Sequence, residues 1–326
     1  MTRLVLLLLT AILSAMSIHC ATVPQNGLTH ATSSPRVTTD SDLDALLPRL
    51  SNWGRWGAAD QLGTLNYITA AKIRDAYALV TEGRTVSLAR AVRLAGNEGI
   101  RRAQYEMMKD ESGTRDFIGG VWHGFAQTHL DALCHAFADP GRMYNGIPTS
   151  EVTDTGCGKL DIGVIAERGV VGRGVLLDVG ALHGGSLEPG TAIMVADLEE
   201  AVRRQRVAIR SGDLLLVRTG AGTRNTRELR AGLHPECLPW VKEKQIALLM
   251  SDGDSDVAPL PAFSRWGSPF HAIAIPHLGM PLVDNADLDP LAALCASRKQ
   301  WEFLVVIAPW RITGATSSPV NPIAIF

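Results

Sequence analysis

The chain has 326 residues, of which 46% are hydrophobic, and its formal net charge is -2 with a pI of about 6.5. This length and hydrophobic content allow one large α/β domain with a sizeable core. Acidic and basic residues are interspersed, so the sequence offers neither the basic patch of a nucleic-acid-binding protein nor a polyanionic tail.

The N-terminus has the pattern of a secretory signal peptide. Met1-Thr2-Arg3 supplies a positive start, residues 4–13 form an apolar core, and residues 14–17 offer small side chains near a cleavage point. The apolar core is short for a membrane-spanning helix. We therefore expect residues 1–20 to be removed on export, to the periplasm or outside the cell, which leaves no stable membrane span.

Residues 21–41 are rich in Thr, Ser and Pro and contain few large apolar side chains. Such a segment cannot bury enough surface to order itself, so we expect a flexible linker before a folded domain over residues 42–326. A lipoprotein anchored through Cys20 is the less favoured alternative, because His19 stands where a small residue normally precedes the cysteine.

The folded part contains four cysteines, which export would place in an oxidising compartment. They allow three disulfide pairings, and the sequence does not choose among them. Their spacing includes no C-x-x-C, which argues against a structural zinc knuckle. The four are Cys134, Cys157, Cys237 and Cys295.

Helices and strands alternate along the predicted domain. Thr69 is a good N-cap for a helix over residues 70–81, a strand follows over 85–92, and the polar stretch 96–119 is expected to be an irregular lid or disordered. Asp197 is expected to cap the next helix. The remaining predicted strands are 175–179, 214–218, 246–250 and 303–307, and the remaining predicted helices are 197–206, 239–245 and 288–296. This pattern predicts a mixed α/β fold.

The stretch from Val121 to His135 holds the most chemistry. If it is extended as far as Asp131, His129 and Asp131 project from the same face, one pleat apart. An imidazole and a carboxylate aimed at one point are suitable ligands for zinc or manganese. His123, Phe125 and Gln127 share that face. The alternative is an exposed edge strand that happens to carry a His and an Asp.

A second group of candidate residues follows the strand predicted over residues 246–250. Alternating aspartates in residues 251–256 suggest a calcium loop, but an EF-hand needs Gly at its sixth position and Glu at its twelfth. Counted from Asp252, these positions are Val257 and Phe263, so the calcium-loop interpretation fails. Loops at the carboxyl ends of strands are where α/β sites gather, so Asp256 is a candidate for the wall of the site.

The run Thr128-His129-Leu130-Asp131-Ala132-Leu133-Cys134-His135 resembles the T-H-x-D-x-x-x-H core of the putative cyclase family, which includes bacterial kynurenine formamidases and isatin hydrolase. The combined pattern is specific although each piece is weak, and it covers most of the chain beyond about Asn52. The resemblance continues through residues 212–220, Pro269-Phe270-His271, Gly279, Asp284 and residues 318–322. It implies a single-domain β/β/α swivelling fold with a mixed sheet and a metal pocket.

The resemblance also implies a ligand set. The family takes one His and, roughly a dozen positions later, one acidic residue from the second half of its site. His271 and Asp284 match them, with Asp where Glu is common, and His277 competes for the His role. We therefore expect His129, Asp131, His271 and Asp284 to hold a divalent metal, Zn or Mn.

This chain departs from the formamidase motif at one position. That motif opens with a further His four residues before His129, and here Phe125 stands in its place, with Gln127 at a Gly position. Phe cannot ligate a metal, so we expect one ion rather than two. His123 lies about 6 to 7 Å further along an extended strand, so it joins the ligands only if a bulge or twist brings it in.

The predicted activity is hydrolysis of an amide, lactam or related acyl bond in a small aromatic molecule, similar to that of an arylformamidase. The metal would lower the pKa of its water from ~16 toward ~7, and His135 would act as the catalytic proton carrier. Trp53, Trp56, Phe125, Gln127 and His123 are the expected substrate contacts.

The resemblance alone points to N-formylkynurenine or isatin-like substrates, as in tryptophan catabolism, although export argues against a cytosolic role in that breakdown. Two alternatives remain open: an exported small-molecule binder with a degenerate metal site, and a metal-dependent cyclase or lyase. Such families often form homodimers or homotetramers.

Overall fold

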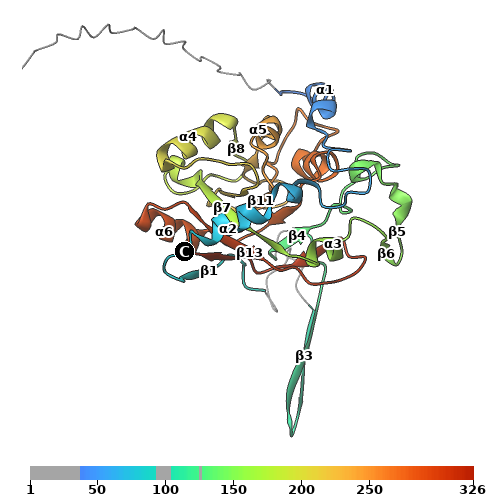
Figure 1. The fold of residues 1–326 in the computed structure, drawn as a ribbon, viewed down its shortest axis with the longest axis vertical. Coiled ribbons are helices and arrows are strands. Elements are labelled where there is room, and N and C mark those ends of the chain that lie inside the picture. The colour runs from blue at the N-terminus through green and yellow to red at the C-terminus, as the bar shows by residue number, and fades with distance from the viewer. Residues whose placement is uncertain (1–36, 93–103, 125–126) are drawn as a thin grey trace, which may run out of the picture. The chain divides into compact units, whose positions relative to one another are not determined.

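The computed structural model describes residues 37–92, 104–124 and 127–326 (Figure 1). The predicted signal peptide, most of the predicted linker and Phe125 lie outside these residues. Within them, nine strands form one mixed sheet in the order β1-β15-β13-β7-β9-β11-β12-β4-β14. The strands are β1 (Thr85–Ser87), β15 (Ile323–Ile325), β13 (Glu302–Ile307), β7 (Val170–Asp178), β9 (Leu214–Arg218), β11 (Leu248–Ser251), β12 (Leu282–Asp284), β4 (His129–Asp131) and β14 (Ser317–Pro319).

The centre of this sheet is parallel and fully covered. β7, β9, β11 and β12 run parallel, whereas β13, β15 and β1 on one side and β4 and β14 on the other add antiparallel strands. Leu214 to Val217 and Val175 to Leu177 are almost wholly buried. Continuous apolar runs of this kind suit strands with both faces covered. The predicted mixed α/β fold is therefore observed.

Helices and short turns surround the sheet. α2 (Ala70–Tyr77) and α4 (Val195–Gln205) pack on β7, and α1 (Asp40–Leu50), α5 (Cys237–Glu243) and the π-helix η6 (Phe270–Leu278) contact one another. α3 (Ile162–Ala166) and α6 (Asp289–Arg298) complete the α-helices of the described residues. Short 3₁₀ turns are η1 (Gly63–Tyr67), η2 (Tyr144–Gly146), η3 (Thr149–Glu151), η4 (Gly180–His183) and η5 (Gly222–Arg224). Two small pairs are β8 (Ala192–Ile193) with β10 (Gly232–Leu233), and β5 (Val152–Thr153) with β6 (Gly156–Cys157).

Several predicted elements have different ends. α2 begins after its Thr69 cap as expected but ends at Tyr77. Of the predicted strand 85–92, residues 85–87 form strand β1, and Ala89 makes an isolated bridge to Ala286. Asp197 is not the N-cap of α4, because the helix begins two residues earlier and Asp197 accepts a hydrogen bond from the Met194 amide. Thr39 caps α1, so helix begins two residues before the expected domain start at residue 42.

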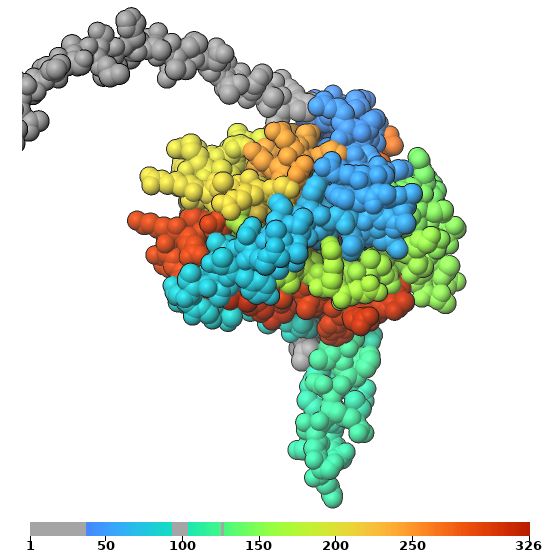
Figure 2. Space-filling model, viewed as in Figure 1, coloured from blue at the N-terminus to red at the C-terminus, as the bar shows by residue number. Residues whose placement is uncertain are grey.

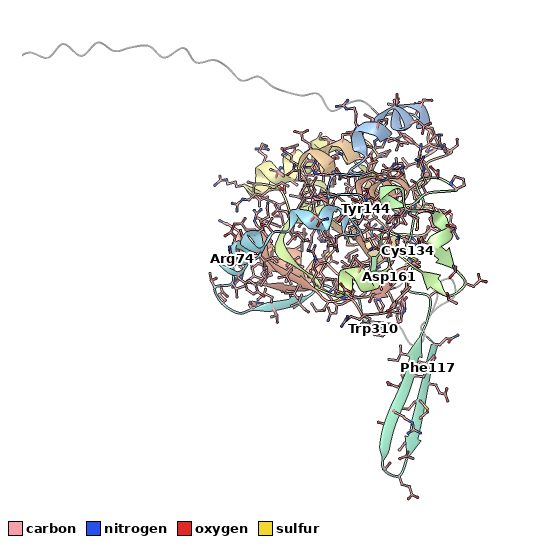
Figure 3. All side chains as sticks on the ribbon, turned by 45° about the vertical axis from the view of Figure 1, so that its right-hand side comes forward. Arg74, Phe117, Cys134, Tyr144, Asp161 and Trp310 are labelled. Carbon is pink, nitrogen blue, oxygen red and sulfur yellow. A yellow bond between two sulfur atoms is a disulfide. The ribbon has the colours of Figure 1, made fainter. Side chains whose placement is uncertain are left out.

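A hairpin replaces most of the expected irregular segment 96–119. β2 (Gln104–Asp110) and β3 (Gly113–Gly119) pair along seven residues each, and neither joins the nine-stranded sheet. Asp110 accepts hydrogen bonds from the backbone of Ser112 and Gly113, which closes the turn. The hairpin projects from the rest of the domain (Figures 1 and 2) and most of its side chains are exposed, including Phe117, which is labelled in Figure 3.

The four cysteines of the described residues form one disulfide and two free thiols. Cys134 and Cys157 form a disulfide, whereas Cys237 and Cys295 are buried and free. Residues 37–92, 104–124 and 127–326 contain no helix that is long and apolar enough to cross a bilayer.

Candidate metal centre

The candidate centre lies where the pairing of neighbouring strands changes from parallel to antiparallel. β12 runs parallel to β11 on one side and antiparallel to β4 on the other, and this register places Asp284 opposite His129. His129 and Asp131 are two residues apart in β4, so both face the same side as the sequence predicted. β14 covers the other edge of β4, with Ser317 opposite Asp131. All three residues of β4 are buried, so its side chains are held away from solvent.

Asp131 is the focus of the cluster, with only 1% of its surface exposed. Its Oδ1 lies 3.0 Å from His123 Nδ1 and 3.5 Å from His129 Nε2. Its Oδ2 lies 3.5 Å from His271 Nε2 and 3.9 Å from His135 Nε2. One buried carboxylate therefore faces four imidazoles, two on each oxygen.

The electrostatics of Asp131 favour its charged form. Burial by itself would raise the pKa of this carboxyl, but the neighbouring His129, His123 and His271 outweigh burial and hold its pKa well below the usual range. Neither Asp131 oxygen has a hydrogen-bond partner of good geometry among the described residues, and the same is true of His123 Nδ1. Buried polar atoms normally find partners, so this arrangement fits a site that receives a cation.

His271 reaches the cluster from the second residue of η6. Its Nε2 lies 3.0 Å from Asp284 Oδ2, and its Nδ1 lies 2.7 Å from Asp256 Oδ2. Burial lowers the pKa of His271, but the carboxylates of Asp284 and Asp254 outweigh burial and raise it well above the usual value. The structure thus brings together all four residues that the sequence proposed as ligands, His271 rather than His277 among them.

His129 is oriented by the backbone that precedes it. Its Nδ1 lies 2.9 Å from the carbonyl oxygen of Gln127, so Nδ1 carries the proton and Nε2 faces Asp131. Gln127 is buried and contacts His129 through its backbone carbonyl. The sequence had proposed a substrate contact for the side chain of Gln127.

His123 lies closer to the cluster than an extended strand would allow. The chain around it is bent rather than extended, and Gly124 has a φ of +116°, a conformation that side chains other than glycine rarely adopt. His123 stacks on His135 with ring centroids 4.1 Å apart, and its Nε2 lies 2.9 Å from Thr316 Oγ1. The change in chain direction that His123 needs in order to approach the proposed ligands is therefore present.

His135 lies beside the proposed ligands. Burial lowers the pKa of this imidazole to about 4, partly offset by the nearby Asp131 carboxylate. It is therefore neutral at neutral pH, with Nε2 directed at Asp131.

Among the described residues, three groups have ligand atoms close enough to share an ion. They are His129 with Asp131 and Asp284, His123 with Asp131 and His135, and Asp254 with Asp256 and His271. Two of the groups share Asp131, so the donor set fits one divalent ion, and His123 and His135 are further donors beside Asp131. The third group is unsuited, because N–H groups already occupy both oxygens of Asp256.

The predicted aromatic walls have other contacts. The Trp53 indole donates a hydrogen bond to the Pro276 carbonyl and stacks on His277, and Trp56 packs edge-on against Tyr67. None of these contacts involves a cluster residue. Trp122, next to His123, instead packs edge-on against the half-exposed Trp310.

In the loop at the end of β11, the sequence indicated a role for the candidate Asp256 alone. Ser255 donates a hydrogen bond to Asp284, and Asp256 binds His271. The available signal was the position of this loop at the carboxyl end of a buried strand. Its contacts with residues 271 and 284 could not be predicted from the sequence, because the fold brings these segments together.

Comparisons with known proteins give a family match and several similar folds. The sequence model of the family described as "Putative cyclase" matches residues 120–255, and no curated protein matches the chain. A solved structure described as a novel cyclase is 29% identical, covers 86% of this chain and 99% of its own, and has a TM-score of 0.78.

Two isatin hydrolases share the fold at lower identity. Isatin hydrolase A from Ralstonia solanacearum is 17% identical over 74% of this chain and 91% of its own, with a TM-score of 0.54. An isatin hydrolase bound to the product analogue thioisatinate is 16% identical over 79% and 98%, with a TM-score of 0.52. The resemblance seen in the sequence is therefore confirmed: the putative cyclase family model matches residues 120–255, and the fold of the novel cyclase structure covers 86% of the chain.

Proposed function

We propose that the protein is a metal-dependent hydrolase that cleaves an amide, lactam or related acyl bond of a small aromatic molecule, in the manner of an arylformamidase. The observation that carries this proposal is the carboxylate of Asp131. It is buried, faces four imidazoles, and lacks well-formed hydrogen bonds among the described residues. A charged group in such surroundings is costly unless a cation accompanies it.

The residues that would hold the ion are His129, Asp131, His271 and Asp284. When bound, a Zn²⁺ or Mn²⁺ ion supplies Lewis acidity, which polarises a carbonyl oxygen and lowers the pKa of water. Neighbouring groups orient these residues: the Gln127 backbone carbonyl orients His129, and the Ser255 hydroxyl holds one oxygen of Asp284. The opposed register of β4 and β12 sets the spacing between His129 and Asp284.

His135 would move the proton. Its lowered pKa keeps His135 neutral at neutral pH, so the imidazole can accept a proton from water, and the resulting imidazolium is a strong enough acid to pass that proton to the leaving nitrogen or oxygen. The stacked ring of His123 fixes the plane of His135, and Thr316 in turn holds His123. This network supports acyl hydrolysis because both proton transfers use one side chain at the edge of the cluster.

The substrate class rests on the family. The likeness to arylformamidases in the Thr128–His135 motif, together with the fold shared with isatin hydrolases, makes N-acyl aromatic compounds and cyclic amides the first class to test. Trp122 and Trp310, which pack against each other beside His123, are the aromatic side chains that we propose to contact such a ring.

We also propose that the protein is exported. The Cys134–Cys157 disulfide supports this, because disulfides persist mainly in oxidising compartments, and the N-terminal sequence has the pattern of a signal peptide. Fractionation of expressing cells tests export, which predicts enzyme with its N-terminus processed near residue 20 outside the cytoplasm.

The proposed activity is tested by elemental analysis together with turnover of formanilides, lactams and lactones before and after chelation. We expect bound Zn or Mn, and a loss of turnover of about 10³-fold on chelation or in His129→Ala, because the metal contributes several kcal/mol to the transition state. His183→Ala is the matched control, since His183 is exposed and pairs with Asp197 on η4 and α4.

Three results would contradict the proposal. Unchanged turnover in His129→Ala would remove the metal centre from the mechanism. Product formed in ¹⁸O-labelled water without incorporation of the label would indicate a cyclase or lyase. Ligand binding by metal-free protein with no turnover of any substrate in the panel would favour the binder.

A further inference from the structure

The loop at the end of β11 contacts two of the proposed ligands. Asp256 is fully buried, and its Oδ1 accepts a hydrogen bond from the Phe270 amide at 2.6 Å. Its Oδ2 lies 3.2 Å from the His271 amide nitrogen and 2.7 Å from His271 Nδ1. The two backbone contacts fix the carboxylate at the start of η6, and the third contact is made to the imidazole itself.

These contacts determine which nitrogen of His271 faces the cluster. A carboxylate cannot donate a hydrogen bond when ionised, so the proton between it and His271 sits on Nδ1. Nε2 is then the nitrogen left for coordination, and it lies 3.0 Å from Asp284 Oδ2 and 3.5 Å from Asp131 Oδ2. Carboxylate partners of this kind orient metal-binding histidines and raise their basicity.

Ser255, the preceding residue, holds the other ligand. Its hydroxyl is buried and donates to Asp284 Oδ1 at 3.1 Å, which leaves Oδ2 on the side of His271. Adjacent residues of one loop therefore orient a His and an Asp that are thirteen positions apart on η6 and β12.

Further hydrogen bonds and an ion pair hold the loop at the end of β11 in place. Arg230 Nε donates to the Asp256 carbonyl at 3.0 Å and lies 3.3 Å from Asp254 Oδ2, and Asp254 Oδ1 accepts from the Asp256 amide at 2.9 Å. Asp252, at the start of the loop, accepts hydrogen bonds from Thr219 and Gly220 at the end of β9. The loop is thus fixed to the parallel centre of the sheet.

We propose that Asp256 is a positioning residue that presets the Nδ1-protonated form of His271 for metal binding, with Ser255 doing the same for Asp284. This inference rests on the proposed metal centre and extends it, because residues 255 and 256 are assigned a role although neither would contact the ion.

The decisive variant is Asp256→Asn. The amide keeps the size of the side chain, but wherever its NH₂ group points it meets an N–H, either of Phe270 or of His271. In the second case the NH₂ group faces both the amide and the ring of His271, and the contact with the ring is relieved only if the ring proton moves to Nε2, which blocks coordination. We expect the affinity for Zn²⁺, measured by competition with a chelating indicator, to fall about 10- to 100-fold.

The matched control is Asp252→Asn. Asp252 lies in the same loop, is equally buried and also accepts three N–H or O–H donors, but its side chain contacts none of the proposed ligands. We expect this variant to lose thermal stability and, while folded by circular dichroism, to bind Zn²⁺ as the wild type does. Equal losses of affinity in both variants would overturn the proposal, because they would reflect general damage to the loop.

A second measurement reads the tautomer directly. In Zn²⁺-loaded protein labelled with ¹⁵N-histidine, the His271 signals are identified by their loss in His271→Gln, and we expect a protonated Nδ1. An unprotonated Nδ1 in the wild type would overturn the proposal. If Asp256→Asn does not fold, Ser255→Ala tests the other half of the loop, with an expected loss of Zn²⁺ affinity of about threefold. Unchanged affinity there would count against the loop's role.

The results separate this inference from the proposed function. Zn²⁺ binding that weakens in Asp256→Asn without any turnover of the substrate panel would leave the positioning role intact and refute the hydrolase. An active enzyme whose Asp256→Asn variant binds Zn²⁺ normally would support the hydrolase and refute the positioning role. A wild type that binds no divalent ion would refute both.

Discussion

The antiparallel pairs β4–β12 and β2–β3 are built in opposite ways. β4 and β12 have three residues each, all buried, and carry His129, Asp131 and Asp284. β2 and β3 have seven residues each in a continuous ladder, yet nearly all of their side chains are exposed. The shorter pair holds the candidate centre, and the longer pair holds none of the residues proposed as ligands.

This contrast shows what fixes a side chain in place. A two-stranded hairpin is only marginally stable in water however long its ladder is, because it lacks a face buried against another layer. β4 is flanked by β12 and β14, and side chains from the β11 loop hold the residues of the centre. Burial and side-chain hydrogen bonds, more than backbone pairing, give the centre its geometry.

The largest effect is expected from Leu130→Ala in β4. Leu130 is fully buried between the two proposed ligands of its strand, and removing its side chain leaves a cavity beneath them. We expect a loss of about 2–5 kcal/mol in the free energy of unfolding, measured with urea. A loss below about 1 kcal/mol would mean that β4 is held by its neighbours' hydrogen bonds alone.

A somewhat smaller effect is expected from removing the Cys134–Cys157 disulfide, which lies next to His135. The double variant Cys134→Ala and Cys157→Ala frees a loop closed over 23 residues of sequence separation, so we expect a loss of about 3 kcal/mol. Reduction of the wild type should give a similar shift in the urea midpoint. A stability that does not respond to reduction would show that the bond adds nothing to the burial around it.

The smallest effect is expected in the hairpin. Met107 is 52% exposed and Phe117 is 50% exposed, so Met107→Ala and Phe117→Ala should each change the free energy of unfolding by less than about 0.5 kcal/mol. The same urea titration measures this. A loss of several kcal/mol from either variant would show that the hairpin is buried in solution, against another copy or another protein, and would end the contrast with β4.

The sequence predicted the parallel centre of the fold well and the hairpin poorly. Apolar runs such as Leu214–Val217 identify buried strands because both faces are covered, and the predicted strand 214–218 matches β9. The polar β2 and β3 carry no such signal, since exposed side chains leave no burial pattern along the chain. The predicted start of α4 was wrong because Asp197, the expected N-cap, lies inside the helix and accepts a hydrogen bond from the amide of Met194, the actual N-cap.

The site was predictable where its residues are close in sequence. The spacing of His129 and Asp131 places both on one face of a strand, and the family motif supplied His271 and Asp284. The approach of His123 depends on a glycine turn, and the roles of Ser255 and Asp256 depend on contacts between β11, η6 and β12. No periodicity along the chain encodes contacts of this kind.

The pairing of His129 with Asp284 across β4 and β12 has an evolutionary implication. Residues directly opposite in an antiparallel ladder keep their separation whatever happens in the roughly 150 residues that connect them along the chain. Insertions and deletions can therefore accumulate in those connections, and reshape the surroundings of the cluster, while the distance between this imidazole and this carboxylate is inherited unchanged.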